Sequence, residues 1–152
     1  TKPVEPVGKD IGFLPGTRDE KMLPWLAPIQ DNLQFLFGND KMTLDMHIDE
    51  GRIEVEAMTY IRGRSICNSF IIIDEAQNMN RHEIKTVLTR VGEGTKIVLT
   101  GDIEQIDNIY IDSTNNGLSY LVEKFKDQEI AGHVTLLKGE RSKVASVSAR
   151  IL

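Results

Sequence analysis

The spacing of apolar residues along the chain alternates between that of strands and that of helices. Continuous apolar runs occur within residues 69–74 (SFIIID) and 95–102 (TKIVLTGD), as expected for strands that are covered on both faces of a sheet. Between them, residues 81–91 place Ile84 and Val87 on one helical face, together with further apolar residues. Strands joined by helices of this length predict an α/β fold with a mainly parallel sheet flanked by helices.

Several further elements follow from the same kind of pattern. Asn80 is placed to cap the helix of residues 81–91, with Glu83 three positions later as in a capping box. Residues 115–126 have the spacing of another helix, whereas residues 52–58 and 133–137 have the pattern of short strands. Apolar residues near the C-terminal end predict a last helix: Val144, Val147 and Ile151.

The first third of the chain has a less regular pattern. Residues 1–16 are rich in proline and glycine, which predicts an irregular, exposed connection. Residues 19–37 have helical spacing, but Pro24 and Pro28 interrupt it, so we expect one broken helix or two short ones. Residues 39–51 are polar and mixed, and we expect an irregular excursion there.

Composition limits the class of protein. A length of 152 residues is that of one domain, so we expect a single domain over residues 1–152. No apolar run reaches the length of about 18 residues that a membrane helix needs, and a lone cysteine, Cys67, fits a reducing cytoplasm. The net charge of −5 provides no general attraction to nucleic acid, so any site for a polyanion must be local.

Two acids follow the first apolar run directly. In an open parallel sheet, ligands bind beyond the carboxyl ends of the strands, which is where Asp74 and Glu75 are expected. The functional interpretation is a Walker B site, in which Asp74 helps to hold Mg²⁺ through water and Glu75 polarises the attacking water. The alternative is that both acids only solvate a strand end, and for an isolated strand this alternative is favoured.

The second strand strengthens the functional interpretation. Its run also ends in polar groups, with Thr100 and Asp102 on either side of Gly101, which permits close approach of a backbone. Gln105 follows one turn later, and a glutamine there can hydrogen-bond a terminal phosphate or a catalytic water. Together with Gln77 of the sequence DEAQ, these residues predict a nucleotide-binding site at one edge of the sheet.

Arginines provide weaker candidates. Arg141 is placed to neutralise charge on a transferring phosphate, because a guanidinium can contact phosphate oxygens in a bidentate manner. Arg62 and Arg64 could contact nucleic acid, a phosphate in a neighbouring subunit, or only water. Each of these arginines, taken alone, is equally or better explained as a solvated surface residue.

Five ordered segments resemble the PhoH family of P-loop ATPases, which is related to superfamily-one helicases. The resemblance covers nearly the whole chain and implies a RecA-like nucleotide-binding core, ATP with Mg²⁺, and an association with RNA or phosphate starvation. It also implies a homo-oligomeric ring, such as a hexamer. The segments are GFLPG (12–16), YIRGRS (60–65), FIIIDEAQN (70–78), LTRVGEGTKIVLTGDIEQID (88–107) and ERS (140–142).

The resemblance also assigns roles to residues. The Walker B motif of the family falls on Asp74 and Glu75, and its arginine falls on Arg141. The phosphate-sensing motif of the family falls on three residues after the second strand: Gly101, Asp102 and Gln105.

One family motif is not found. A P-loop needs the pattern G-x-x-x-x-G-K-[S/T], but the pair Gly8 and Lys9 is followed by Asp10, and Pro3 occupies the position of the first glycine. We therefore expect the chain to be the C-terminal portion of an ATPase domain whose nucleotide-binding core is incomplete at the N-terminus. We also expect it to have little ATPase activity by itself.

Three functions remain open at this stage. The first is an ATPase that couples hydrolysis to remodelling of RNA, and the second is a ring-forming module that binds nucleotide or RNA without turnover. The third is a phosphatase or nuclease that uses acids directly on a metal, with Asp107 and Asp112 as possible further ligands. This third class does not explain why Gln77, Gln105 and Arg141 occur together.

Overall fold

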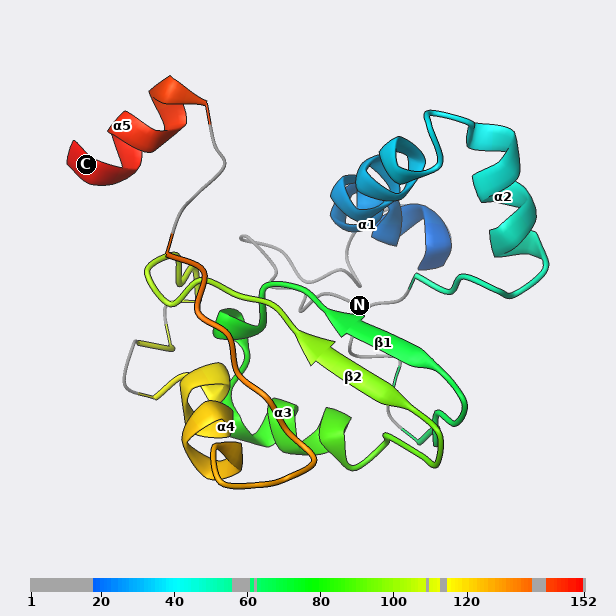
Figure 1. Ribbon diagram of the computed structural model, residues 1–152. Coiled ribbons are helices and arrows are strands. Elements are labelled where there is room, and N and C mark those ends of the chain that lie inside the picture. Colours follow the sequence, from blue (N-terminus) through cyan, green and yellow to red (C-terminus); the bar gives the residue numbers. More distant parts are fainter. Residues whose placement is uncertain are drawn as a thin grey trace. The chain divides into compact units, whose positions relative to one another are not determined.

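The computed structural model describes residues 18–55, 61, 63–108, 110–112, 115–137 and 142–151. The chain divides into two units, Thr1–Leu121 and Val122–Leu152, which are described separately. The elements in chain order are α1 (Arg18–Leu36), α2 (Lys41–Asp49), β1 (Phe70–Ile73), the 3₁₀ helix η3 (Ala76–Asn78), α3 (Arg81–Leu88), β2 (Lys96–Leu99), α4 (Gly117–Phe125) and α5 (Lys143–Ile151) (Figure 1).

The sheet in the described residues consists of β1 and β2. The two strands run parallel, in a register that pairs Phe70 with Lys96 and Ile73 with Leu99 (Figure 1). Helix α3 forms part of the connection between them, as parallel strands require. The predicted α/β character and the parallel pairing are therefore confirmed, while the larger RecA-like core stays a prediction.

The hydrophobic core lies on one face of this sheet. Its buried residues come from β1, from η3 and the residue after it, and from α3, and each buried Ile, Val or Met side chain contributes about 1.5–3 kcal/mol of transfer free energy. The core residues are Ile73, Ala76, Met79, Ile84 and Val87, with Ile71, Leu88, Ile97, Leu99, Leu118 and Leu121 packed against them.

The opposite face of the sheet is exposed. Phe70 is 62% exposed, Ile72 is 52% exposed and Val98 is 37% exposed. The apolar runs predicted strands covered on both faces, and this part of the prediction is wrong for the described structure. An apolar run shows that both faces of a strand are apolar, but it does not show what packs against each of them.

The predicted start of α3 is confirmed in atomic detail. The side chain of Asn80 accepts hydrogen bonds from the backbone N–H groups of His82 (2.9 Å) and Glu83 (3.0 Å). The carboxylate of Glu83 accepts a bond from the backbone N–H of Asn80 at 2.8 Å, which completes the capping box. The helices predicted over residues 115–126 and at the C-terminal end are also present, as α4 and α5.

The N-terminal helices differ from the prediction. Helix α1 continues through Pro24 and Pro28 as one helix rather than breaking at them. Helix α2 forms where an irregular excursion was expected, because Asp40 caps it by accepting bonds from the Thr43 N–H (3.2 Å) and hydroxyl (2.6 Å). Leu44 of α2 is buried, which shows that this segment packs rather than remaining solvated.

The described residues of the two additional predicted strands do not form strands. Residues 52–55 form no strand, and residues 56–58 lie outside the described residues, as does the predicted irregular connection of residues 1–16. Residues 133–137 are described without strand pairing, and Leu136 is 87% exposed. A strand needs a hydrogen-bonding partner, which an alternating sequence pattern cannot supply by itself. Among the described helices, none has the length and apolar character needed to cross a membrane.

Candidate functional site

Polar residues gather where β1 and β2 end, at a surface that we call the strand-end edge (residues 74–78 and 100–108). Pairing continues beyond the strands, because the Thr100 N–H donates to the Ile73 carbonyl at 2.8 Å and the Ala76 N–H donates to the Thr100 carbonyl at 2.9 Å. The two polar segments therefore lie side by side, as the sequence predicted for a parallel pair.

Asp74 is the first polar residue of this edge. It is half-buried, and its Oδ1 accepts a hydrogen bond from the Thr100 hydroxyl at 2.9 Å. The bond joins the ends of the two strands and orients the carboxylate. A carboxylate fixed in this way can accept bonds from water molecules around a divalent cation.

Glu75 has an uncommon backbone conformation. Its φ of 57° and ψ of 36° lie in the left-handed region, which costs a non-glycine residue about 1–2 kcal/mol. The hydrogen bond from the Ala76 N–H to Thr100 holds the chain in this turn. Such outliers are found preferentially at functional sites, where the surrounding structure stabilises them. The side-chain Oε2 of Glu75 accepts a bond from Gln77 Nε2 at 2.6 Å.

Gln77 is fully buried beneath the edge rather than presented on its surface. Its Nε2 also donates to the backbone carbonyl of Gln105 at 2.9 Å, and its Oε1 accepts from the backbone N–H of Asp102 at 3.2 Å. The structure therefore brings Glu75, Gln77, Asp102 and the Gln105 backbone together.

Gly101 allows the close approach that its sequence position suggested. A Cβ atom at this position would lie 2.6 Å from Gln77 Oε1 and 2.8 Å from Leu118 Cδ2, both closer than real contacts permit. The side chains of Asp102 and Gln105 are exposed at the edge. Asp102 Oδ1 accepts from the Glu104 N–H at 3.0 Å, which shapes the turn that leads to Gln105.

Buried asparagines support the edge, and their burial was not predicted from the sequence. Asn78 Oδ1 accepts from the backbone N–H groups of Asp107 (2.8 Å) and Asn108 (3.2 Å), and Asn108 Nδ2 donates to the Asn78 carbonyl at 3.2 Å. Asn116, which lies outside the edge and just before α4, is also fully buried and donates to Ser119 Oγ at 3.0 Å. The only signal in the sequence was the abundance of asparagine, which usually indicates turns rather than buried amides.

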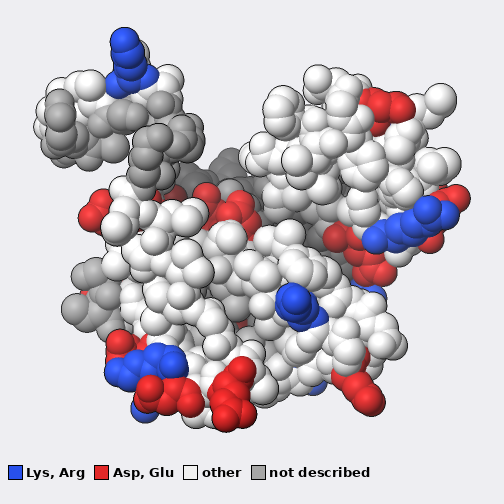
Figure 2. All heavy atoms as spheres, in the orientation of Figure 1, with Lys and Arg blue, Asp and Glu red and all other residues white. Residues whose placement is uncertain are grey.

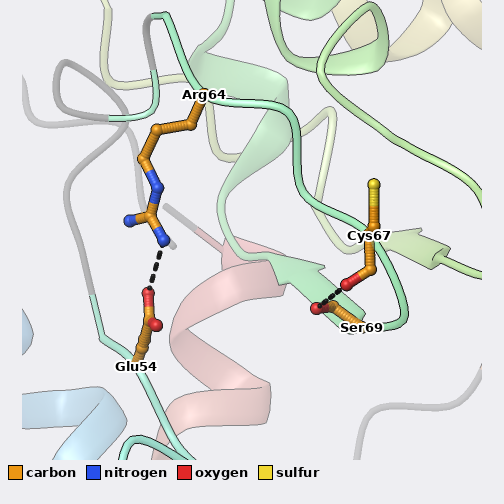
Figure 3. A network of polar contacts seen from close by, with 4 residues as sticks. All are labelled: Glu54, Arg64, Cys67 and Ser69. Atoms are coloured by element: carbon orange, nitrogen blue, oxygen red, sulfur yellow. Dashed lines mark hydrogen bonds and ion pairs between the residues drawn. The ribbon is translucent and has the colours of Figure 1, made fainter.

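Of the three arginine candidates, the structure describes Arg64. Arg141 and Arg62 lie outside the described residues. Arg64 forms an ion pair with Glu54, with Arg64 Nη2 3.2 Å from Glu54 Oε2, and both side chains are largely exposed (Figure 3). The same view shows the Ser69 hydroxyl donating to the Cys67 carbonyl at 2.9 Å.

The carboxylates at the strand-end edge suit a cation that keeps most of its bound water molecules. In the described part of the chain, no group of three or more His, Cys, Asp or Glu side chains is arranged to hold a metal. Mg²⁺ is commonly bound through one or two carboxylates together with waters and phosphate oxygens, which fits Asp74 and Glu75. Asp112 instead accepts two bonds from Asn115, at 2.9 and 3.2 Å, so the predicted alternative with several direct metal ligands gains no support.

Surface charge is mixed. Figure 2 shows lysine and arginine side chains as separate small groups on the visible face, with acidic groups distributed among the described elements. This arrangement fits the net charge of −5, and the described residues form no broad basic surface on that face.

Comparison with known proteins identifies the family. The chain matches the family described as PhoH-like protein over residues 1–149. It is 63% identical over 153 aligned residues to Protein PhoH2 of Bacillus subtilis, which covers 99% of this chain and 35% of that protein. It is 37% identical over 134 residues to Protein PhoH of Escherichia coli, which covers 88% of this chain and 37% of that protein.

A third relative, Protein PhoH2 of Mycolicibacterium smegmatis, is 41% identical over 145 residues, which cover 95% of this chain and 32% of that protein. The chain thus spans about a third of the length of these curated relatives. Because the family match extends over almost all of the sequence, the chain belongs to the PhoH-like protein family.

Proposed function

We propose that the strand-end edge binds ATP with Mg²⁺ and supports its hydrolysis in the full-length protein. The observation that carries this proposal is the joint placement of Asp74 and Glu75 beside Thr100, with the Asp74 carboxylate held by the Thr100 hydroxyl at 2.9 Å. Carboxylates at the ends of adjacent parallel strands lie where ligands of open α/β sheets bind.

Four residues of the edge have a role in this proposal: Asp74, Glu75, Asp102 and Gln105. Asp74 accepts hydrogen bonds from the water shell of the cation, which supplies positive charge against the phosphates when bound. Glu75 polarises the attacking water and accepts its proton. The exposed side chain of Gln105 hydrogen-bonds the terminal phosphate or the water, and Asp102 lies in the same turn.

The remaining parts of the proposal rest on the family resemblance. Arg141 neutralises charge that develops on the phosphate, the protein assembles as a homo-oligomeric ring, and hydrolysis is coupled to remodelling of RNA. Backbone amides and a lysine that bind the phosphates are expected from a P-loop. Residues 1–10 do not have the P-loop pattern.

A second candidate has one observation in its favour. The Glu75 carboxylate is engaged by the Gln77 amide at 2.6 Å, which could keep it from activating water. The alternative is a ring-forming module that binds nucleotide or RNA and does not hydrolyse ATP.

The test is a titration of the full-length protein with Mg-ATP, with and without single-stranded RNA. Phosphate release and nucleotide binding are measured on the same samples. Release that increases with RNA supports the coupled ATPase, whereas binding without release supports the non-hydrolysing module. Metal-dependent cleavage of nucleic acid in the absence of ATP would contradict both.

A further inference from the structure

Gln77 uses its whole side-chain amide inside the protein. Both bonds from Nε2 reach acceptors, the Glu75 carboxylate at 2.6 Å and the Gln105 carbonyl at 2.9 Å, and Oε1 faces the Asp102 N–H at 3.2 Å. The opposite orientation of the amide would place its oxygen against two acceptors and its nitrogen against a donor. Only one orientation therefore satisfies all three partners.

This amide connects two segments that are distant in sequence. Glu75 belongs to the turn after β1, whereas Asp102 and Gln105 belong to the loop after β2. Gly101 permits the contact, because a Cβ there would lie 2.6 Å from Gln77 Oε1 and 3.0 Å from the Gln77 backbone nitrogen. The position of the loop and the orientation of the Glu75 carboxylate are therefore determined by the same buried side chain.

We infer that Gln77 is a positioning residue that couples the loop of residues 101–105 to the Glu75 carboxylate. This inference rests on the proposed function, in which the loop contacts the terminal phosphate and Glu75 acts on water. A shift of the loop moves the Gln105 carbonyl and the Asp102 N–H, and Gln77 must follow both. Because its Nε2 also holds Glu75, the same shift reorients the carboxylate or releases it toward the nucleotide.

A purely structural role makes a different prediction. A buried amide that only stabilises the fold, when lost, lowers the stability of the protein, while the molecules that stay folded keep their kcat. A positioning residue, when lost, lowers kcat in the folded protein while KM changes little. The variants below separate these two roles.

The first test is Gln77→Glu in the full-length protein. This change keeps the shape of the side chain but places a second carboxylate against Glu75. We expect kcat for Mg-ATP to fall at least about tenfold, with KM changed less than about threefold.

Asn108→Asp is the matched control. Asn108 is also a buried amide of the same loop, but its side chain contacts the Asn78 carbonyl (3.2 Å) and the Tyr110 N–H (3.0 Å). We expect this variant to be less stable than the wild type, with a smaller loss of kcat in the folded protein than in Gln77→Glu. A Gln77→Glu enzyme with wild-type kcat, or an equal loss of kcat in folded Asn108→Asp, would overturn the inference.

A second variant gives a measurement that does not depend on turnover. Gln77→Met keeps the length of the side chain and removes its hydrogen bonds, so the Asp102 N–H loses its acceptor. We expect hydrogen exchange at Asp102 to accelerate at least about tenfold. Exchange at the Ala76 N–H, which donates to Thr100, is expected to change less.

The two measurements separate the failure of each proposal. If the wild-type protein hydrolyses no ATP, the proposed function fails, while accelerated exchange at Asp102 in Gln77→Met still supports the link between Gln77 and the loop. If hydrolysis depends on Glu75 but exchange at Asp102 is unchanged in Gln77→Met, the coupling inference is overturned and the proposed function stands.

Discussion

The turn after β1 is largely buried although most of its residues are polar, whereas residues 131–137 are exposed although several of them are apolar. The turn carries polar residues, yet Gln77 is 0% exposed and Asn78 is 6% exposed. The segment carries apolar residues, yet Val134 is 79% exposed and Leu137 is 95% exposed. Polar groups are buried in the turn because each finds a hydrogen-bonding partner, whereas the apolar segment lacks a strand to pair with among the described residues.

The largest expected effect on stability concerns the residue that follows this turn. Met79 is fully buried in the core, so Met79→Ala removes packing and leaves a cavity. We expect it to lower the free energy of unfolding of the full-length protein by about 2–5 kcal/mol in urea denaturation. Val134→Ala in the exposed segment is the control and is expected to change it by less than about 0.5 kcal/mol. Equal effects would show that the two regions are packed alike.

The next comparison adds a methyl group to Gly101, which packs against the turn after β1, and to Gly132 of the exposed segment. Gly101→Ala places a Cβ 2.6 Å from Gln77 Oε1, and we expect a loss of about 1–3 kcal/mol of unfolding free energy from overpacking. Gly132→Ala has no atom within 4 Å of the added Cβ, and we expect little change. Gly101→Ala with wild-type stability would contradict the close packing of the loop against Gln77.

The next prediction concerns the capping box at the start of α3, which follows the turn after β1. Asn80 accepts two backbone bonds at the start of α3, so Asn80→Ala is expected to cost about 1 kcal/mol of unfolding free energy. Asn80→Asp keeps a capping oxygen and is expected to remain close to the wild type in the same measurement. If both variants were equally destabilised, the capping bonds would not explain the effect.

The smallest effect concerns α2 and depends on pH. The hydroxyl and the backbone N–H of Thr43 hold the pKa of Asp40 below its ordinary value. A lowered pKa in the folded state means that Asp40 stabilises α2 above its unfolded pKa and loses this effect as pH falls through the folded pKa. We expect the amide shift of Thr43 to follow this titration by NMR, and Asp40→Asn to remove it. A Thr43 titration that persists in Asp40→Asn would assign it to another group.

Local signals in the sequence predicted the elements that depend on local interactions. The box of Asn80 and Glu83 predicted the start of α3, and the apolar runs predicted β1 and β2. Predictions failed where the outcome depended on distant partners, as for residues 133–137, which lack a pairing strand in the described structure. Helix α2 was not predicted, because residues 39–51 are polar and mixed and Asp40 was not recognised as a helix cap.

The candidate site was predicted in part for the same reason. The order of strands placed Asp74 and Thr100 at one edge, and the structure joins them by a hydrogen bond of 2.9 Å. The burial of Gln77 and the bond from its amide to Glu75 could not be predicted, because they depend on the path of the loop after β2. The role of each residue in nucleotide chemistry stays a prediction.

The most direct test of the central claim is hydrolysis and binding of Mg-ATP by the full-length wild type and the variant Glu75→Gln. We predict that kcat falls at least about 100-fold, because the group that accepts the proton of water is lost, while the Kd for Mg-ATP changes less than about threefold. Glu104→Gln, which changes an exposed acid of the same edge, is the control and should retain activity. Wild-type turnover in Glu75→Gln would contradict the claim that this edge is the catalytic site.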